Sequence, residues 1–303
     1  MTAPSEDVAA PPAGPLTWWP APAKLNLFLH VTHRYSDGYH ALQTVFQLIE
    51  RCDRIGLASR ADGRIERRTP LAQIPPDQDL TVRSARALQR HTGVRLGADI
   101  HLAKQIPLGG GLGGGSSDAA TVLVALNALW NTGLALEELA RLGLALGADV
   151  PVFVHGASAW AEGRGERLTS LELPQRWYLV VHPGVAVSTA EIFQAAELTR
   201  NSPVITIRDF SPDRVGNVCE PVVRTRYPAV GEALEWLSRQ SGEFGHRVQG
   251  RMSGTGSCVF AAFDSAEQAE RVAARVPDRW SSFVARGLNR SPLHEQLQRW
   301  CLQ

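Results

Sequence analysis

The sequence has few cysteines, no excess of charge of one sign and no long apolar run. Its four cysteines are scattered over 303 residues and form no C-x-x-C pair of the kind that binds zinc or performs redox chemistry. The formal net charge is +1, whereas a surface for nucleic acid or a membrane needs a basic excess. No apolar run approaches the ~20 residues that span a bilayer. We expect a cytoplasmic protein that binds neither nucleic acid nor membranes.

The N-terminal end differs from the rest of the chain in composition. Residues 1–17 are rich in Ala and Pro and show no apolar periodicity, so we expect a disordered tail there. In the next segment, AKLNLFLHV, apolar residues alternate with Lys24, Asn26 and others, which predicts a strand with a buried face. The Asp37-Gly38 turn signal and a second alternating segment, LQTVFQLIE, then favour a hairpin.

Helix and strand signals alternate through the rest of the chain. The pattern predicts a helix over residues 80–91 and a strand over 98–104, followed by a glycine-rich stretch and a helix that is apolar on nearly every side. Towards the C-terminus, a strand–helix–strand run follows a second glycine loop, SGTGS. We therefore predict an α+β fold with an N-terminal domain over residues 18–165 and a C-terminal domain over 166–303.

The glycine-rich stretch IPLGGGLGGGSSDAA, which begins at Ile106, contains six glycines in fifteen residues. Glycine costs conformational entropy on folding, so such a cluster indicates a backbone that a ligand approaches closely. A flexible linker does not fit, because the stretch lies between a strand and a buried helix. Backbone amides at a helix N-terminus bind anions with the help of the helix dipole. The stretch therefore predicts a phosphate-binding loop, with Ser116 or Ser117 near the N-cap of the helix.

Two known phosphate-binding patterns fit this stretch poorly. The P-loop requires Lys directly before Ser or Thr, and Gly115 stands at that position. The dinucleotide pattern G-x-G-x-x-G is met by Gly109, Gly111 and Gly114, but the acidic residue that should follow a second strand falls at 137–138, inside a predicted helix. An NAD-linked oxidoreductase stays as an alternative function, and so does a non-catalytic nucleotide-binding regulator.

Three separated motifs resemble the GHMP kinases, the family of galactokinase, homoserine kinase, mevalonate kinase and phosphomevalonate kinase. PLGGGLGGGSSDAA is similar to the family's phosphate loop, and PAKLNLFL and SGTGSCVF are similar to its first and third motifs, in the same order. The resemblance covers roughly residues 18–293. It implies a two-domain α+β fold, in which an ATP-binding α/β domain precedes a ferredoxin-like α+β domain. It also implies that the γ-phosphoryl group of ATP is transferred to an alcohol, with Mg²⁺ as cofactor.

Five segments are similar to those family members that phosphorylate the 2-OH of a cytidine diphosphate-linked alcohol in the non-mevalonate synthesis of isoprenoid precursors. They are PAKLNLFLHV, DGYHALQTVFQ, LGADVPVF, AEGRGERL and HPGV. This likeness implies that Asp149 is the base that accepts the hydroxyl proton and that Lys24 is the cation that supports it. From the residues alone, Asp149 would be a turn former and Lys24 a solvent-facing lysine of an edge strand.

The same likeness implies two sets of binding residues. The residues implied to bind ATP are Lys104, Pro107, Leu108, Gly109, Gly110, Gly111, Leu112, Gly113, Gly114, Gly115, Ser116 and Ser117. The residues implied to bind the cytidyl acceptor are Asn26, Tyr39, His40, Thr189 and Phe193. In this arrangement the two aromatic rings stack on the pyrimidine, while His40 and Thr189 bond to its edge. From the residues alone, Lys104 is equally well explained as a surface lysine at the end of a strand, and Tyr39 and Phe193 as aromatic residues that pack locally.

One position departs from the family pattern. The family commonly has Asn before the Leu that starts the helix near residue 80, close to the adenine, whereas this chain has Asp79. The adenine contact of that position is therefore in question. The histidines show no metal-ligand spacing with nearby carboxylates, and the sequence indicates neither the protein groups that touch Mg²⁺ nor the oligomeric state.

Overall fold

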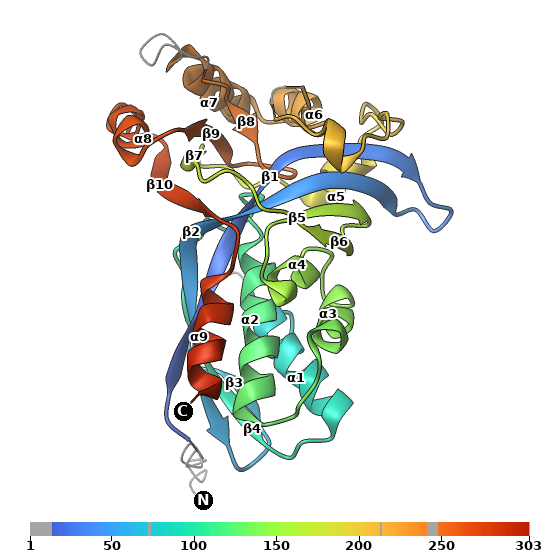
Figure 1. Ribbon diagram of the computed structural model, residues 1–303, viewed down its shortest axis with the longest axis vertical. Helices are drawn as coiled ribbons and strands as arrows, with labels where there is room; N and C mark the ends of the chain where they lie inside the picture. Colours follow the sequence, from blue (N-terminus) through green and yellow to red (C-terminus); the bar gives the residue numbers. More distant parts are fainter. Residues whose placement is uncertain (1–13, 72–73, 213, 241–247, 303) are drawn as a thin grey trace, which may run out of the picture.

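The computed structural model describes residues 14–71, 74–212, 214–240 and 248–302 (Figure 1). Residues 1–13 of the predicted tail lie outside the described residues. Thr17, the last residue of that prediction, already belongs to the first strand and pairs with Leu57 of the second. The Thr17 hydroxyl also donates to the Leu57 carbonyl at 3.2 Å. The prediction of a disordered tail is therefore wrong for Thr17.

Two long antiparallel strands, β1 (Thr17–Arg34) and β2 (His40–Arg60), run across the molecule (Figure 1). In the turn that joins them, the backbone N–H of Tyr35 donates to the Tyr39 carbonyl at 2.8 Å, and Gly38 adopts a φ of +89°. Glycine suits that position because other residues rarely adopt a positive φ. The hairpin that the Asp-Gly signal predicts is confirmed.

The strands of both halves of the chain belong to one mixed sheet. Its main path is β3-β4-β2-β10-β7-β9-β8; β1 and β5 also pair with β2, and β6 pairs with β5. Within this sheet, β10 of the C-terminal half pairs antiparallel with β2 of the N-terminal half at Gly287 and Leu288. The remaining strands are β3 (Ile65–Arg67), β4 (Gly97–Ala103), β5 (Ala159–Gly163), β6 (Arg167–Ser170), β7 (Trp177–His182), β8 (Arg251–Met252), β9 (Val259–Phe263) and β10 (Ser281–Leu288).

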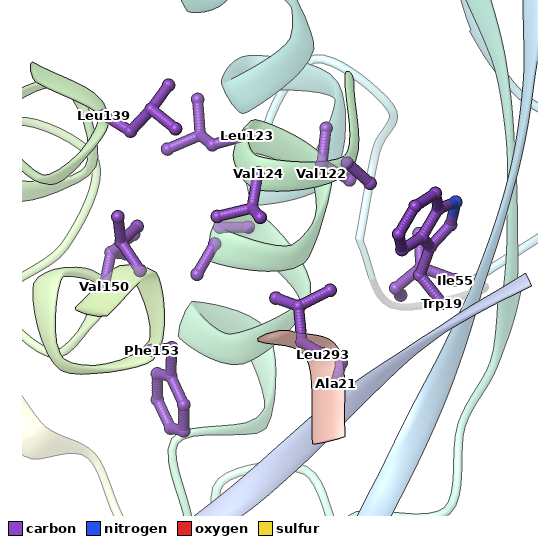
Figure 2. Packing of buried hydrophobic residues seen from close by; sticks show 14 of the residues in the cluster. Trp19, Ala21, Ile55, Val122, Leu123, Val124, Leu139, Val150, Phe153 and Leu293 are labelled. Atoms are coloured by element: carbon purple, nitrogen blue, oxygen red, sulfur yellow. The ribbon is translucent and has the colours of Figure 1, made fainter. Parts of the chain in front are cut away.

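Helix α2 (Gly114–Leu129) forms the centre of the N-terminal half and packs against α1, α4 and β1. Every residue from Ser117 to Leu126 is buried, as expected for a helix that is apolar on nearly every side. Figure 2 shows Leu123 close to Leu139 on one side of this helix, with Trp19 on the other. The other helices are α1 (Leu80–Thr92), α3 (Leu136–Leu144), α4 (Val150–His155), α5 (Thr189–Gln194), the 3₁₀ helix η1 (Ile207–Asp209), α6 (Glu220–Arg226), α7 (Pro228–Ser238), α8 (Ala266–Ala273) and α9 (Pro292–Cys301).

The helix predicted over 80–91 and the strand predicted over 98–104 are confirmed as α1 and β4. The last helix, α9, returns to the N-terminal half (Figure 1), where Leu293 is buried in the same core as α2. The ring centroids of Trp300 and Trp19 are 5.7 Å apart. The end of the chain thus helps to enclose the N-terminal core. The domain limits 18–165 and 166–303 stay a prediction. In the part of the chain that the structure describes, no helix is long and apolar enough to cross a membrane.

Candidate active site

The glycine-rich stretch joins β4 to α2 in a loop whose backbone needs glycine. Gly109, Gly111 and Gly113 have φ values of +66°, +72° and +72°, a region that other residues rarely adopt. Gly113 is the N-cap of α2, and the helix begins one residue later. Ser116 and Ser117, expected near the N-cap, lie three and four residues after it, in the first turns of the helix; the cap itself is the left-handed Gly113.

A second glycine loop, residues 253–256, packs against the first. A Cβ added at Gly111 would lie 2.1 Å from the carbonyl oxygen of Ser253, so this close approach requires glycine. The carbonyl oxygens of residues 109–113 each accept a hydrogen bond, and their donors include Ser253 Oγ at 2.8 Å and the backbone N–H of Cys258 at 3.0 Å. Hydrogen bonds to its carbonyl groups therefore hold this loop in one conformation.

Lys24 and Asp149 lie together beside the loop. Lys24 Nζ is 3.3 Å from Asp149 Oδ2, and it donates to the Gly111 carbonyl at 3.0 Å and to Asn26 Oδ1. Lys24 is only 2% exposed, whereas the Asp149 side chain is 34% exposed. Lys24 is thus a buried cation and not a solvent-facing lysine. It links the glycine-rich loop to a partly exposed carboxylate.

The chain positions the partners of Lys24 from two directions. Asp149 occupies the N-cap position of α4, yet in the described structure its side chain makes no cap hydrogen bond, which leaves the carboxylate for other contacts. Asn26 follows Lys24 on β1 by two residues, so the two side chains share a face. Asn26 Nδ2 donates to Thr44 Oγ1 of β2 at 3.0 Å, and this contact orients its oxygen towards Lys24.

These groups line a cavity of about 450 Å³. The predicted site residues on its wall are Lys24, Asn26, Pro107, Leu108, Gly109, Gly110, Gly111, Leu112, Gly113, Gly114, Gly115, Ser116, Asp149, Thr189 and Phe193. Lys104 and Ser117, which were also predicted to bind ATP, are not part of this wall. Ser117 is fully buried within α2, and Lys104 forms ion pairs with Asp53 and Asp118. The structure therefore brings the predicted catalytic pair and most of the predicted phosphate loop to one place.

An adjoining cavity of about 820 Å³ contains the residues predicted to hold the pyrimidine. Those residues are Tyr39, His40, Thr189 and Phe193. The ring of His40 stacks on that of Phe193, with centroids 5.3 Å apart and planes at 26°, and Arg200 Nε donates to His40 Nε2 at 3.1 Å. Burial lowers the pKa of His40, and the positive charges of Arg200 and Arg34 add to this effect. A neutral His40 that accepts at Nε2 carries its proton on Nδ1, where it is a hydrogen-bond donor.

Lys104 lies between two carboxylates at the end of β4. Its Nζ pairs with Asp53 of β2 and with Asp118 in the first turns of α2, and its side chain is 17% exposed. Asp53 Oδ1 also accepts from the backbone N–H of Ile106 at 2.8 Å, three residues before Gly109. This buried ion-pair cluster joins β2, β4 and α2 beneath the phosphate loop. A contact between Lys104 and the nucleotide stays a prediction.

Asp79, which departs from the family pattern, caps α1. Its Oδ1 accepts from the backbone N–H of Thr81 at 2.8 Å, while its Oδ2 pairs with Arg67 Nη1 at 2.6 Å. The carboxylate is nearly buried and both of its oxygens are bonded. Its contacts are therefore those of a helix cap and an ion pair.

Sequence reasoning missed four residues that the structure brings to the site or beneath it. These are Asp53, Asp118, Arg164 and Ser253. Ser253, Asp118 and Arg164 lie within or directly beside segments that the motif analysis quoted, so closer attention to those segments could have found them. Asp53 carries no local signal, because only the pairing of β2 with β4 brings it to Lys104.

Two family models match the chain. The model described as GHMP kinases N terminal domain matches residues 79–157, and the one described as GHMP kinases C terminal matches residues 205–282. A curated protein from Alkalilimnicola ehrlichii, named 4-diphosphocytidyl-2-C-methyl-D-erythritol kinase, is 59% identical over 92% of this chain and 94% of its own length. A protein of the same name from Nitrosococcus oceani is 53% identical over 93% of this chain and 98% of its own length.

Solved structures agree with these relatives. A crystal structure of a 4-(cytidine 5'-diphospho)-2C-methyl-D-erythritol kinase matches with a TM-score of 0.76 and 32% identity, over 89% of this chain and 99% of that one. The homoserine kinase from Cytophaga hutchinsonii matches with a TM-score of 0.61 and 16% identity over 94% and 98%, which shows the shared fold. None of this supports an NAD-linked oxidoreductase, and residues 137–138 lie in α3 and not after a strand, as the dinucleotide pattern would require. The chain is a kinase and belongs to the GHMP kinase family.

Proposed function

We propose that this kinase transfers the γ-phosphoryl group of ATP to the 2-hydroxyl of 4-diphosphocytidyl-2-C-methyl-D-erythritol, the compound for which its relatives are named. The observation that carries the proposal is the adjacency of two cavities with different linings. One contains the glycine loop, Lys24 and Asp149, and the other contains Tyr39 and His40, which suit a pyrimidine. An acceptor with a cytidyl group at one end and an alcohol at the other has the chemistry that both cavities need.

Phosphoryl transfer needs in-line placement and charge neutralisation more than covalent chemistry from the protein. In our proposal, the loop at 107–116 holds the phosphates of ATP with its amides and the N-terminal dipole of α2. Asp149 accepts the proton of the acceptor hydroxyl as the oxygen attacks. Lys24, 3.3 Å from Asp149, orients that carboxylate and offsets the negative charge that develops during transfer.

Mg²⁺ would enter as part of the substrate, Mg·ATP. This ion prefers oxygen ligands and usually keeps several waters and substrate phosphates. The start of α2 offers an oxygen of this kind on the cavity wall, because Ser116 lines the cavity and carries a hydroxyl. We propose that the ion is held mainly by phosphate oxygens on this side of the loop, where it neutralises part of their charge.

We further propose that the cytosine occupies the larger cavity. Tyr39 and Phe193 would stack on the base, and His40 and Thr189 would bond to its edge. The donor at His40 Nδ1 matches the O2 and N3 acceptors of cytosine, and Phe193 is already paired with His40. A cytoplasmic location, where ATP and such a small-molecule acceptor are both present, remains part of the proposal.

The test is an assay of ADP release with Mg·ATP and the diphosphocytidyl alcohol, with the phosphorylated position read from the product. Asp149→Asn should lower kcat by ~10²–10⁴-fold, the usual contribution of a general base, and leave the Kd for ATP nearly unchanged. Wild-type turnover in Asp149→Asn would refute the role of Asp149. Tight ATP binding without turnover of the alcohol would refute the proposed reaction and favour a nucleotide-binding regulator.

A further inference from the structure

The two cavities share part of their wall, and one charged side chain belongs to the shared part. The residues that line both are Leu42, Ala148, Arg164, Thr189 and Phe193. The inference that follows rests on the proposed function. If the cytosine lies in the larger cavity and the reacting hydroxyl lies beside Asp149 in the smaller one, the diphosphate that joins them must cross this shared wall, where Arg164 provides the charge.

The fold presents Arg164 at a defined place, at the tip of the turn between β5 and β6. Gly163 and Gly165 flank it with φ values of +73° and +113°, a conformation that favours glycine on both sides. Glu166 Oε2 accepts a hydrogen bond from the backbone N–H of Arg164 at 2.5 Å. The Glu166 carboxylate folds back over the turn, where a Cβ added at Gly163 would lie 2.6 Å from it.

The guanidinium of Arg164 is partly exposed and can exchange its partners. It lies over the Tyr39 ring, 4.1 Å from the centroid, and forms an ion pair with Asp37. The side chains of Arg164 and Asp37 are 40% and 49% exposed, so this pair is weak in water. A ligand oxygen can therefore replace Asp37 at little cost.

The other basic side chains on these walls have different tasks. Arg34, in the larger cavity, donates its Nε to the Gly38 carbonyl at 3.2 Å within the β1–β2 turn. Lys24, in the smaller cavity, is buried against Asp149. Arg164 is the basic side chain that borders both cavities, which places it where the middle of the acceptor would pass.

We propose that Arg164 binds the diphosphate of the acceptor and exchanges its ion pair with Asp37 for one with the phosphate oxygens. A planar guanidinium matches two phosphate oxygens at once, and such charge-assisted bonds are stronger than neutral ones. Because the same guanidinium lies on Tyr39, binding of the diphosphate also holds the ring that faces the base. Arg164 thus selects acceptors that carry a diphosphate next to the cytidine.

Calorimetric titration with cytidine and with cytidine diphosphate tests this role on the full-length protein. Arg164→Ala should weaken binding of the diphosphate about tenfold, the loss expected for a hydrogen bond to a charged group that is partly exposed, and leave cytidine binding within about twofold. Arg167→Ala is the matched control, because it removes the same charge three residues later from an exposed side chain that lines neither cavity, and it should change neither affinity. Raising the salt concentration should reduce the effect of Arg164→Ala.

In steady-state assays, Arg164→Ala should raise the KM for the acceptor about tenfold and leave kcat and the KM for ATP unchanged. Equal losses of affinity for cytidine and its diphosphate would refute the assignment, because Arg164 would then support the base and not the phosphates. Unchanged affinities, or a lower kcat at saturating acceptor, would refute it as well. If the wild-type protein bound neither ligand, the cytidyl acceptor of the proposed function would itself be wrong.

Discussion

Replacement of Asp118 tests the electrostatics of the buried cluster beneath the phosphate loop. Asp118 is 3% exposed, and its Oδ2 pairs with Lys104, which also pairs with Asp53. Burial raises the pKa of Asp118 from 3.8 to about 7; the positive charge of Lys104 opposes this rise and the negative charge of Asp53 adds to it. Ionisation of this carboxyl group in the folded protein therefore costs free energy, whereas ionisation in the unfolded chain does not.

The sign of the pH dependence follows from the raised pKa. Between pH 4 and pH 7 the folded state binds the Asp118 proton and the unfolded state has lost it, so the free energy of unfolding falls as the pH rises through this window. At 1.36 kcal/mol per pKa unit, the interval from pH 5 to pH 7 corresponds to about 2–3 kcal/mol. Asn has nearly the shape of a protonated Asp and does not titrate. The free energy of unfolding of Asp118→Asn, relative to that of the wild type, should therefore increase by about 2–3 kcal/mol when the pH is raised from 5 to 8.

Urea unfolding of both proteins at pH 5 and pH 8 measures this gain. Subtracting the wild-type free energy from that of the variant at each pH cancels the titration of all groups that the two proteins share. Asp278→Asn, which replaces an exposed aspartate, is the matched control and should show the same difference at both pH values. A difference for Asp118→Asn that stays constant, or that becomes less favourable at pH 8, would refute the reasoning.

Three further substitutions probe the two cavities. Gly111→Ala should strongly lower the melting temperature and ATP turnover, because its Cβ would lie 2.1 Å from the Ser253 carbonyl oxygen. Gly115→Ala is the control and should have a mild effect, because the nearest atom to its Cβ would be 3.7 Å away. Equal effects of the two substitutions would contradict the role of the close approach. Lys24→Arg should lower kcat about as much as Lys24→Ala, because a planar fork does not replace a compact ammonium. Recovery of kcat by Arg would show that charge alone suffices. Phe193→Ala should raise the KM for the acceptor ~5- to 150-fold, the worth of one stacked base, and leave the KM for ATP unchanged; the reverse would place the ring at the nucleotide.

The elements around the site could be predicted because their signals are local. Alternation and the Asp37-Gly38 turn predict the hairpin, and helical periodicity predicts α1 within one residue of its end. The glycine cluster predicts a loop between a strand and a buried helix, and the structure has this loop between β4 and α2. In each case the residues that carry the signal are neighbours along the chain, so no knowledge of the tertiary contacts is needed.

The buried ion-pair cluster could not be predicted in this way. Lys104 is 51 residues from Asp53 and 14 from Asp118, and only the pairing of β2 with β4 and the start of α2 bring the three together. On the sequence, Lys104 has the same appearance as a lysine at the exposed end of a strand. The start of α2 shows a related difficulty: Ser116 and Ser117 are good N-cap residues, yet Gly113 takes that place because the loop turns through a left-handed residue.

Lys24 shows why the proposed catalytic pair could not be located from periodicity alone. Alternation places Lys24 and Asn26 on one face of β1, but whether that face meets solvent depends on what packs over it. The second glycine loop covers it: the backbone N–H of Asn26 donates to Ser253 Oγ at 3.1 Å, across 227 residues of sequence. A buried ammonium is costly unless acceptors surround it. Here Asp149, the Gly111 carbonyl and Asn26 supply them, and because each comes from a different segment, the same contacts that make the burial tolerable also bring the predicted base to the phosphate loop.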